Sequence, residues 1–70
     1  MNKLKELRQD KHYSRDFLAS ISGVNIETIK HIEDGTTIIE HCKLSTLIKL
    51  SIGLGCKVVD LLPNRILKYF

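Results

Sequence analysis

The residues of this sequence that could bind a metal or perform catalysis are few and stand apart. There are two cysteines, Cys42 and Cys56, and three histidines. His41 and Cys42 are adjacent, and two adjacent side chains cannot supply the tetrahedral ligand set that zinc needs. We find no carboxylate pair, no glycine-rich phosphate loop and no nucleophile with a base beside it. We therefore predict a protein that is not an enzyme, with no catalytic residue, no metal and no cofactor.

The stretch from Arg15 to Asp34 has the pattern of two short helices joined by a tight turn. Gly23 supplies the positive-φ residue that ends the first helix. Asn25 is suited to cap the second, because its side-chain oxygen can accept from a free backbone N–H. Ala19 is small where the helices must cross closely. Apolar residues recur at helical spacing on both sides of the turn: Phe17, Leu18, Ile21, Ile26, Ile29 and Ile32. The pattern predicts a helix-turn-helix; a helical hairpin without a ligand is the plain alternative.

Length and composition predict one small domain in the cytoplasm. No apolar run approaches the ~20 residues that span a bilayer, and the N-terminus lacks the apolar core of a signal peptide. We therefore expect no membrane partner, and free thiols in a reducing compartment. The net charge of +3 permits nucleic-acid binding without requiring it.

The segment from Leu4 to Leu62 resembles the helix-turn-helix domain of the XRE family, which includes the phage Cro and C1 repressors. The matching residues are Leu4, Leu7, Arg8, Ser14 to Ala19, Gly23, Val24, Ile29, Ile32, Glu33, Gly35, Leu50, Leu54, Gly55, Leu61 and Leu62. The resemblance implies an all-α fold, a compact five-helix lambda-repressor-like domain over residues 1–63. Its second and third helices would form the helix-turn-helix.

The five helices are expected at about residues 2–11, 15–22, 26–33, 44–54 and 58–62. The fourth is expected to bury Leu44, Leu47, Ile48, Leu50, Ser51 and Leu54. Residues 64–70 form an apolar C-terminal tail. The resemblance implies that this tail makes a dimer contact, although folding back on its own core is the alternative. The contact would use Ile66, Leu67, Tyr69 and Phe70.

The resemblance also implies which residues meet DNA, because the third helix of the family enters the major groove. Ile26, Glu27 and His31 then occupy base-reading positions. Glutamate can accept from cytosine N4, histidine can donate to guanine and isoleucine can cover a thymine methyl. The residues expected near phosphates or flanking bases are Arg15, Asn25, Thr28, Lys30, Thr36 and Thr37. A solvated side chain without a ligand is the alternative for each.

Glu33 ends the third predicted helix, where a carboxylate opposes the helix dipole. The resemblance supplies a reason, because the family pairs this glutamate with an arginine of the first helix. We predict a partly buried Arg8–Glu33 ion pair with a structural role. Removal of Arg8 would leave a semi-buried charge unpaired, at a cost of roughly 2–4 kcal/mol.

Two features weaken the DNA-binding interpretation. Residues 25–34 hold one basic residue against three acidic ones, whereas residues 1–15 hold five basic against two acidic. After Gly35, the basic residues usual in the family are replaced by Thr36 and Thr37. Ile38 and Ile39 follow in a long loop and are too apolar to stay free in water. They predict packing against the bundle or a surface for a partner.

Together these features predict a DNA-binding regulator of transcription, in the style of a phage Cro/C1 repressor. It would bind double-stranded DNA as a homodimer and read a palindromic operator through its third helix. The alternative is a protein-interaction module on the same fold, such as a co-regulator, antirepressor or antitoxin, whose partner is another regulatory protein. Such a module would bind DNA weakly or not at all.

Overall fold

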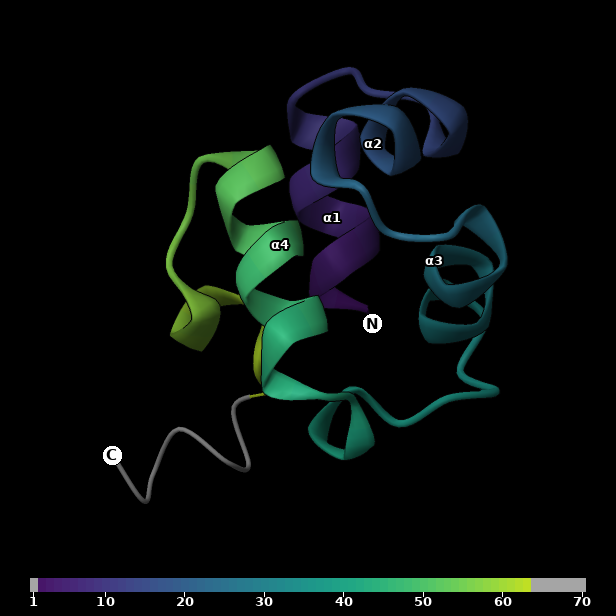
Figure 1. Ribbon diagram of the computed structural model, residues 1–70, viewed down its shortest axis with the longest axis vertical. Coiled ribbons are helices and arrows are strands. Elements are labelled where there is room, and N and C mark those ends of the chain that lie inside the picture. Colours follow the sequence, from purple (N-terminus) through teal and green to yellow (C-terminus); the bar gives the residue numbers. More distant parts are fainter. Residues whose placement is uncertain (1, 64–70) are drawn as a thin grey trace.

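The computed structural model describes residues 2–63 of the 70-residue chain, and all regular structure in that range is helical. Figure 1 shows α3 and η2 on opposite sides of the bundle, with α1 and α4 between them. The elements are α1 (Lys3–Asp10), α2 (Arg15–Ser22), α3 (Ile26–Glu33), the 3-10 turn η1 (Ile39–His41), α4 (Leu44–Leu54) and the 3-10 turn η2 (Val58–Leu61). The all-α prediction is confirmed for this part of the chain.

The predicted fifth helix differs from the structure, because residues 58–61 form a 3-10 turn and not an α-helix. Lys57 precedes the turn and gives no oxygen to cap it, and the Asp60 carboxylate instead accepts from the Lys57 backbone N–H at 2.9 Å. Leu62 is extended, with ψ of 145°, because a residue before proline avoids the helical region. Pro63 therefore ends the element after a single turn.

Gly23 and Asn25 act around the helix-turn-helix as predicted, and Ser14 adds a cap at the start of α2. The Ser14 hydroxyl accepts from the Phe17 N–H at 3.0 Å and caps α2. The Asn25 side chain accepts from the Glu27 N–H at 2.8 Å and caps α3. Gly23 ends α2 with φ of 73°, in the left-handed region. These caps fix the turn and hence the direction in which α3 leaves it.

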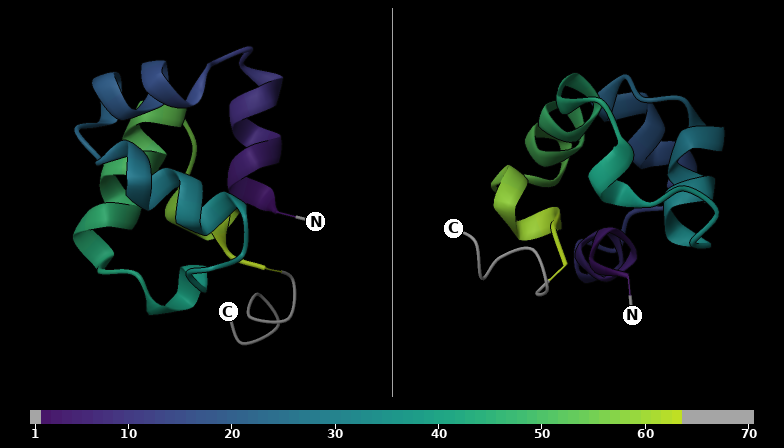
Figure 2. Two further views of the ribbon diagram at one scale, coloured as in Figure 1. Left: turned by 90° about the vertical axis from the view of Figure 1, so that its right-hand side faces the viewer. Right: turned by 90° about the horizontal axis from the view of Figure 1, so that it is seen from below.

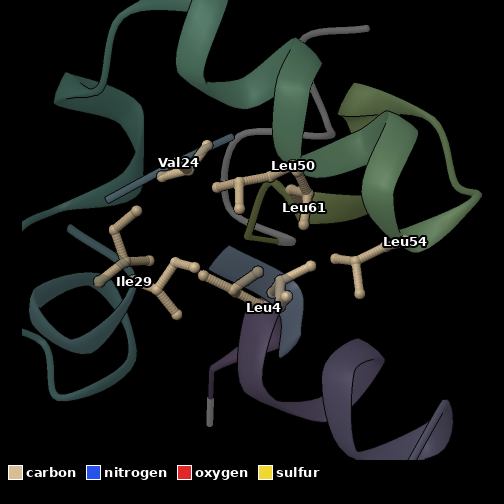
Figure 3. Packing of buried hydrophobic residues seen from close by; sticks show 8 residues of the cluster. Leu4, Val24, Ile29, Leu50, Leu54 and Leu61 are labelled. Atoms are coloured by element: carbon tan, nitrogen blue, oxygen red, sulfur yellow. The ribbon is translucent and has the colours of Figure 1, made fainter. Parts of the chain in front are cut away.

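The core lies between α1, α2, α3, α4 and η2. Figure 3 shows side chains from these elements pointing toward one another. Burial of each such leucine or isoleucine stabilises the fold by about 1.5–3 kcal/mol. The fully buried members are Leu4, Leu18, Ile29, Ile32, Leu50, Leu54 and Leu61. This core holds α3 from one side only.

The prediction that α4 buries Leu44 and Ile48 is wrong, since these side chains are 65% and 41% exposed. The helix packs through Leu47, Leu50 and Leu54, and its buried polar residue is Ser51, as predicted. Leu44, Ile48 and Ile52 recur every fourth residue and lie on another face of the helix. Among residues 2–63, no element buries that face.

Three further predictions concern the C-terminal tail, the domain division and the membrane. The tail residues lie outside the described residues, so the proposed dimer contact through Ile66, Leu67, Tyr69 and Phe70 stays a prediction. The division into a domain of residues 1–63 and a tail of residues 64–70 also stays a prediction. No helix in the described part of the chain has the length and apolar character needed to cross a bilayer.

Candidate nucleic-acid interface

Helix α3 is anchored by its apolar face and presents its polar face outward. Ile29 and Ile32 are 0% and 1% exposed, whereas Asn25, Glu27 and His31 are exposed. In the left view of Figure 2, α3 crosses the front of the molecule, and no other described element lies over it. The remaining predicted contact residues of the helix are half-buried: Ile26, Thr28 and Lys30. The structure thus brings the predicted base-reading side chains together on one open surface.

The acidity of α3 is smaller at its surface than the sequence suggests. Glu33 is buried with its side chain 0% exposed, so its charge does not contribute to the outer face. Glu27 forms an exposed ion pair with Lys30 at 3.7 Å. Such a pair contributes little to stability, but it places a cation beside the outward carboxylate. The outer face of Ile26–Glu33 therefore carries one negative and one positive charge, and the exposed Asp34 lies directly beyond the helix.

The predicted ion pair between Arg8 and Glu33 is present. The Arg8 Nε donates to Glu33 Oε2 at 2.6 Å and its Nη2 donates to Oε1 at 2.9 Å. The remaining Arg8 nitrogen, Nη1, donates to the Tyr13 carbonyl at 2.7 Å. Arg8 is 10% exposed and its fork is fully used inside the protein. It ties the end of α1 to the end of α3 and is not available to DNA.

Arg15, predicted to contact phosphate, has a second partner that the sequence did not indicate. Its Nε donates to Glu33 Oε1 at 3.0 Å, and its side chain is 39% exposed. Glu33 Oε1 is therefore shared by two arginines. The start of α2 is thereby joined to the end of α3 across the helix-turn-helix.

The two arginines keep Glu33 ionised. Burial by itself raises the pKa of Glu33, but the hydrogen bonds from Arg8 and Arg15 and their charges outweigh burial and lower it. The hydrogen bond to Glu33 raises the pKa of Arg8, against the opposing effect of its own burial. Two positive charges and one negative charge thus meet at this point, and one positive charge is left in excess.

The two threonines of the loop after α3 form hydrogen bonds within the protein. The backbone N–H of Thr36 donates to Asp34 Oδ1 at 2.8 Å, and that of Thr37 donates to the His31 carbonyl at 3.0 Å. The Thr36 side chain also bonds Asp34, and these two bonds from Thr36 lower the pKa of that carboxyl. The backbone N–H groups are therefore occupied, and a phosphate contact in this loop would depend on side chains.

Asn2 is a contact residue of the site that sequence reasoning missed. Its side chain accepts from the Lys5 N–H at 3.0 Å and caps α1. Its amide also donates to the Ile32 carbonyl at 2.6 Å, at the end of α3. An asparagine before a helical pattern signals the cap, but the partner 30 residues away has no local signal. Asn2 and Arg8 together hold the end of α3 against both ends of α1.

The candidate metal ligands of the sequence do not gather. Within residues 2–63, no group of three His, Cys, Asp or Glu side chains could hold an ion. Cys42 and Cys56 are free and half-buried. Burial raises the pKa of both thiols, so the uncharged form is favoured.

Comparison with known proteins agrees with this geometry. The family model of the Cro/C1-type helix-turn-helix DNA-binding domain matches residues 3–63. The chain is similar to the restriction-modification controller protein C.AhdI from Aeromonas hydrophila, known from a crystal structure, with 29% identity and a TM-score of 0.75. The similarity covers 84% of this chain and 85% of that chain. Comparison with curated proteins gives no match. This chain belongs to the Cro/C1-type helix-turn-helix DNA-binding family.

Proposed function

We propose that this protein regulates transcription by binding a specific DNA operator with α3 in the major groove. The observation that carries the proposal is the open polar face of α3, where Asn25, Glu27 and His31 are exposed above a buried apolar face. A helix presented in this way fits the width of the major groove. The similarity to a restriction-modification controller protein supports a regulatory role. Such a protein would act as a phage repressor or as the regulator of a restriction-modification system.

Selection of bound fragments from a genomic or random DNA pool tests the proposal. We expect enrichment of one sequence motif, and an affinity that falls steeply with salt. The slope of log affinity against log salt should be about −0.9 for each phosphate contacted. Failure to retain any duplex at low salt would refute the DNA-binding proposal.

Single substitutions separate base readers from phosphate contacts. We expect His31→Ala or Glu27→Gln to cost about 1–3 kcal/mol of binding free energy and to relax the preference at one position of the site. Loss of Lys30 or of the Thr37 hydroxyl should weaken binding evenly across sequences. His41→Ala is a matched control, since His41 is another histidine outside the core. A His31→Ala protein with unchanged sequence preference would remove His31 from the base readers.

We further propose that the protein binds as a homodimer and reads a pseudo-palindrome. Two copies of α3 related by a two-fold axis would meet half-sites about 34 Å apart. The selected motif should then contain inverted repeats at that spacing. A chain that ends after Pro63 tests the part played by the apolar tail. An unchanged elution volume after truncation would argue against a dimer held by the tail.

A protein-interaction module is the second candidate, and one observation favours it. Leu44, Ile48 and Ile52 form an apolar stripe on α4 that no element of residues 2–63 covers, with Ile52 75% exposed. Exposed apolar stripes of this kind often mark protein contacts. Ile52→Lys should abolish binding of a protein partner and leave DNA binding intact. Loss of the selected DNA motif in Ile52→Lys would instead link the stripe to DNA binding.

A further inference from the structure

The two arginines that bond Glu33 differ in exposure and in the number of nitrogens that they use inside the protein. Arg8 uses Nε, Nη1 and Nη2 on partners inside the protein and is 10% exposed. Arg15 donates only Nε to Glu33, and its side chain is 39% exposed. Within residues 2–63, the Arg15 Nη1 and Nη2 groups make no hydrogen bond. One arginine is therefore fully used, and the other is held by a single nitrogen.

This arrangement depends on the shape of the guanidinium group. Its five N–H donors lie in one plane. When Nε is bound to a carboxylate, the edge formed by the two Nη groups stays open to a second acceptor. A pair of Nη groups can bind two oxygens of one phosphate in parallel. A lysine ammonium has a single nitrogen and presents no such fork.

The charges also favour an anion at this place. Arg8 and Glu33 neutralise one another, so the positive charge of Arg15 is the excess charge of the cluster. Arg15 is the first residue of α2, where the unpaired N–H groups and the helix dipole add positive potential. Two acidic residues oppose this: Asp16, which follows Arg15 in the first turn of α2, and Asp34, whose pKa is lowered in part by the charge of Arg15.

We propose that Glu33, through the bond from its Oε1 to Arg15 Nε, positions the Arg15 fork to bind a phosphate of the DNA backbone. This inference rests on the proposed DNA-binding function. It gives Glu33 a part in DNA binding as a positioning residue, besides its part in the fold. It also explains what arginine adds at this place, because its Nε bonds Glu33 while its two Nη groups can offer parallel bonds to one phosphate.

Two variants of Arg15 test the proposal on the full chain with its selected duplex. Arg15→Gln removes the charge, whereas Arg15→Lys keeps the charge and removes the fork. We expect Arg15→Gln to lower affinity about tenfold for each protomer bound and to reduce the salt slope by about 0.9 for each phosphate no longer bound. Arg15→Lys should lose most of the same affinity, because its single nitrogen cannot offer two parallel bonds to the phosphate while it also bonds Glu33. Lys49→Gln on α4 is a charge-matched control, and we expect it to bind as the wild type does.

A double-mutant cycle separates positioning from a merely structural part for Glu33. In a Glu33→Gln background, Arg15→Lys should weaken binding by less than twofold further, because the fork is already released. If Glu33→Gln does not fold, the comparison of Arg15→Lys with wild type decides alone. Wild-type affinity and slope in Arg15→Lys would overturn the inference and leave the proposed function standing. If the wild type binds no duplex, the proposed function is wrong and the inference falls with it.

Discussion

Gly53 of α4 faces Ser22 of α2 so closely that a Cβ atom on the glycine would lie 3.1 Å from the Ser22 Cβ. A Leu18 methyl would lie 3.4 Å away. Glycine inside a helix normally costs about 1 kcal/mol relative to alanine. Here it lets the two helices approach, so we expect Gly53→Ala to give none of that gain. Gly53→Val should destabilise the fold by about 1–3 kcal/mol through overpacking, as measured by urea unfolding.

Removal of the Ser22 side chain, which is the other half of this contact, provides the control. Ser22→Gly removes the Cβ that the new methyl group would meet. In that background Gly53→Ala should recover about 1 kcal/mol. If Gly53→Ala in the wild-type background raises stability by the full ~1 kcal/mol, α2 can shift at little cost and the glycine is not required for packing.

The parts of the fold that can be predicted from the sequence rest on local partners. Ser14, Gly23 and Asn25 act on backbone groups within four residues, so a short pattern identifies them. Two of the exposed apolar residues of α4, Leu44 and Ile48, show the limit of this reasoning. Helical periodicity shows that α4 has apolar faces, but it does not show which of them the bundle covers. The prediction places these two residues on the wrong face for that reason.

The candidate site can be predicted only in part for a similar reason. The resemblance supplies the Arg8–Glu33 pair, because the family has that pair. It does not supply the Arg15–Glu33 bond, whose partners are 18 residues apart. A carboxylate has two oxygens and accepts several donors, so one recognised partner does not exclude another. The arginine at the start of α2 is the signal in the sequence, but it indicates a phosphate contact and not a bond to Glu33.

Arg8→Ala should destabilise the domain by about 2–4 kcal/mol. The side chain of Glu33 is 0% exposed, so it cannot regain water when Arg8 is lost. Arg15 still bonds Glu33, which keeps the loss below that of a wholly unpaired charge. Urea unfolding followed by circular dichroism measures the change. Arg15→Ala, at a 39% exposed side chain, should cost about 1 kcal/mol or less. Equal losses for the two variants would mean that Arg8 is not the main partner of Glu33.

The stability of the domain should fall in acid because of Glu33. Its pKa is lower in the folded protein than in the unfolded chain, where a glutamate has a pKa of about 4.3. The unfolded state therefore takes up the proton first, and the contribution of Glu33 is fully present above about pH 5. It is lost as the pH falls through about 4.3 toward the folded pKa. Urea unfolding at a series of pH values measures this dependence.

Glu33→Gln removes this titration, so its stability should vary less with pH between about 5 and 3. Asp34 also has a lowered pKa, so some acid dependence should remain in the variant. The same acid dependence in both proteins would assign the effect to other carboxylates. An NMR titration of the Glu33 carboxyl in the wild type gives the folded pKa directly and serves if the variant does not fold.

His12 is the residue other than glycine that takes a positive φ among residues 2–63, with φ of 59°. It follows α1, and its backbone N–H donates to the Gln9 carbonyl at 2.9 Å. This conformation costs a residue with a Cβ about 1–2 kcal/mol, whereas glycine loses about 0.5–1 kcal/mol through the entropy of its unfolded chain. His12→Gly should therefore stabilise the domain by about 0.5–1 kcal/mol, measured by urea unfolding.

Gly23→Ala is the reverse test, because nothing lies within 4 Å of the added Cβ and only the backbone strain remains. It should destabilise by about 1 kcal/mol. If His12→Gly lowers stability, the His12 side chain contributes more to the fold than its backbone strain costs.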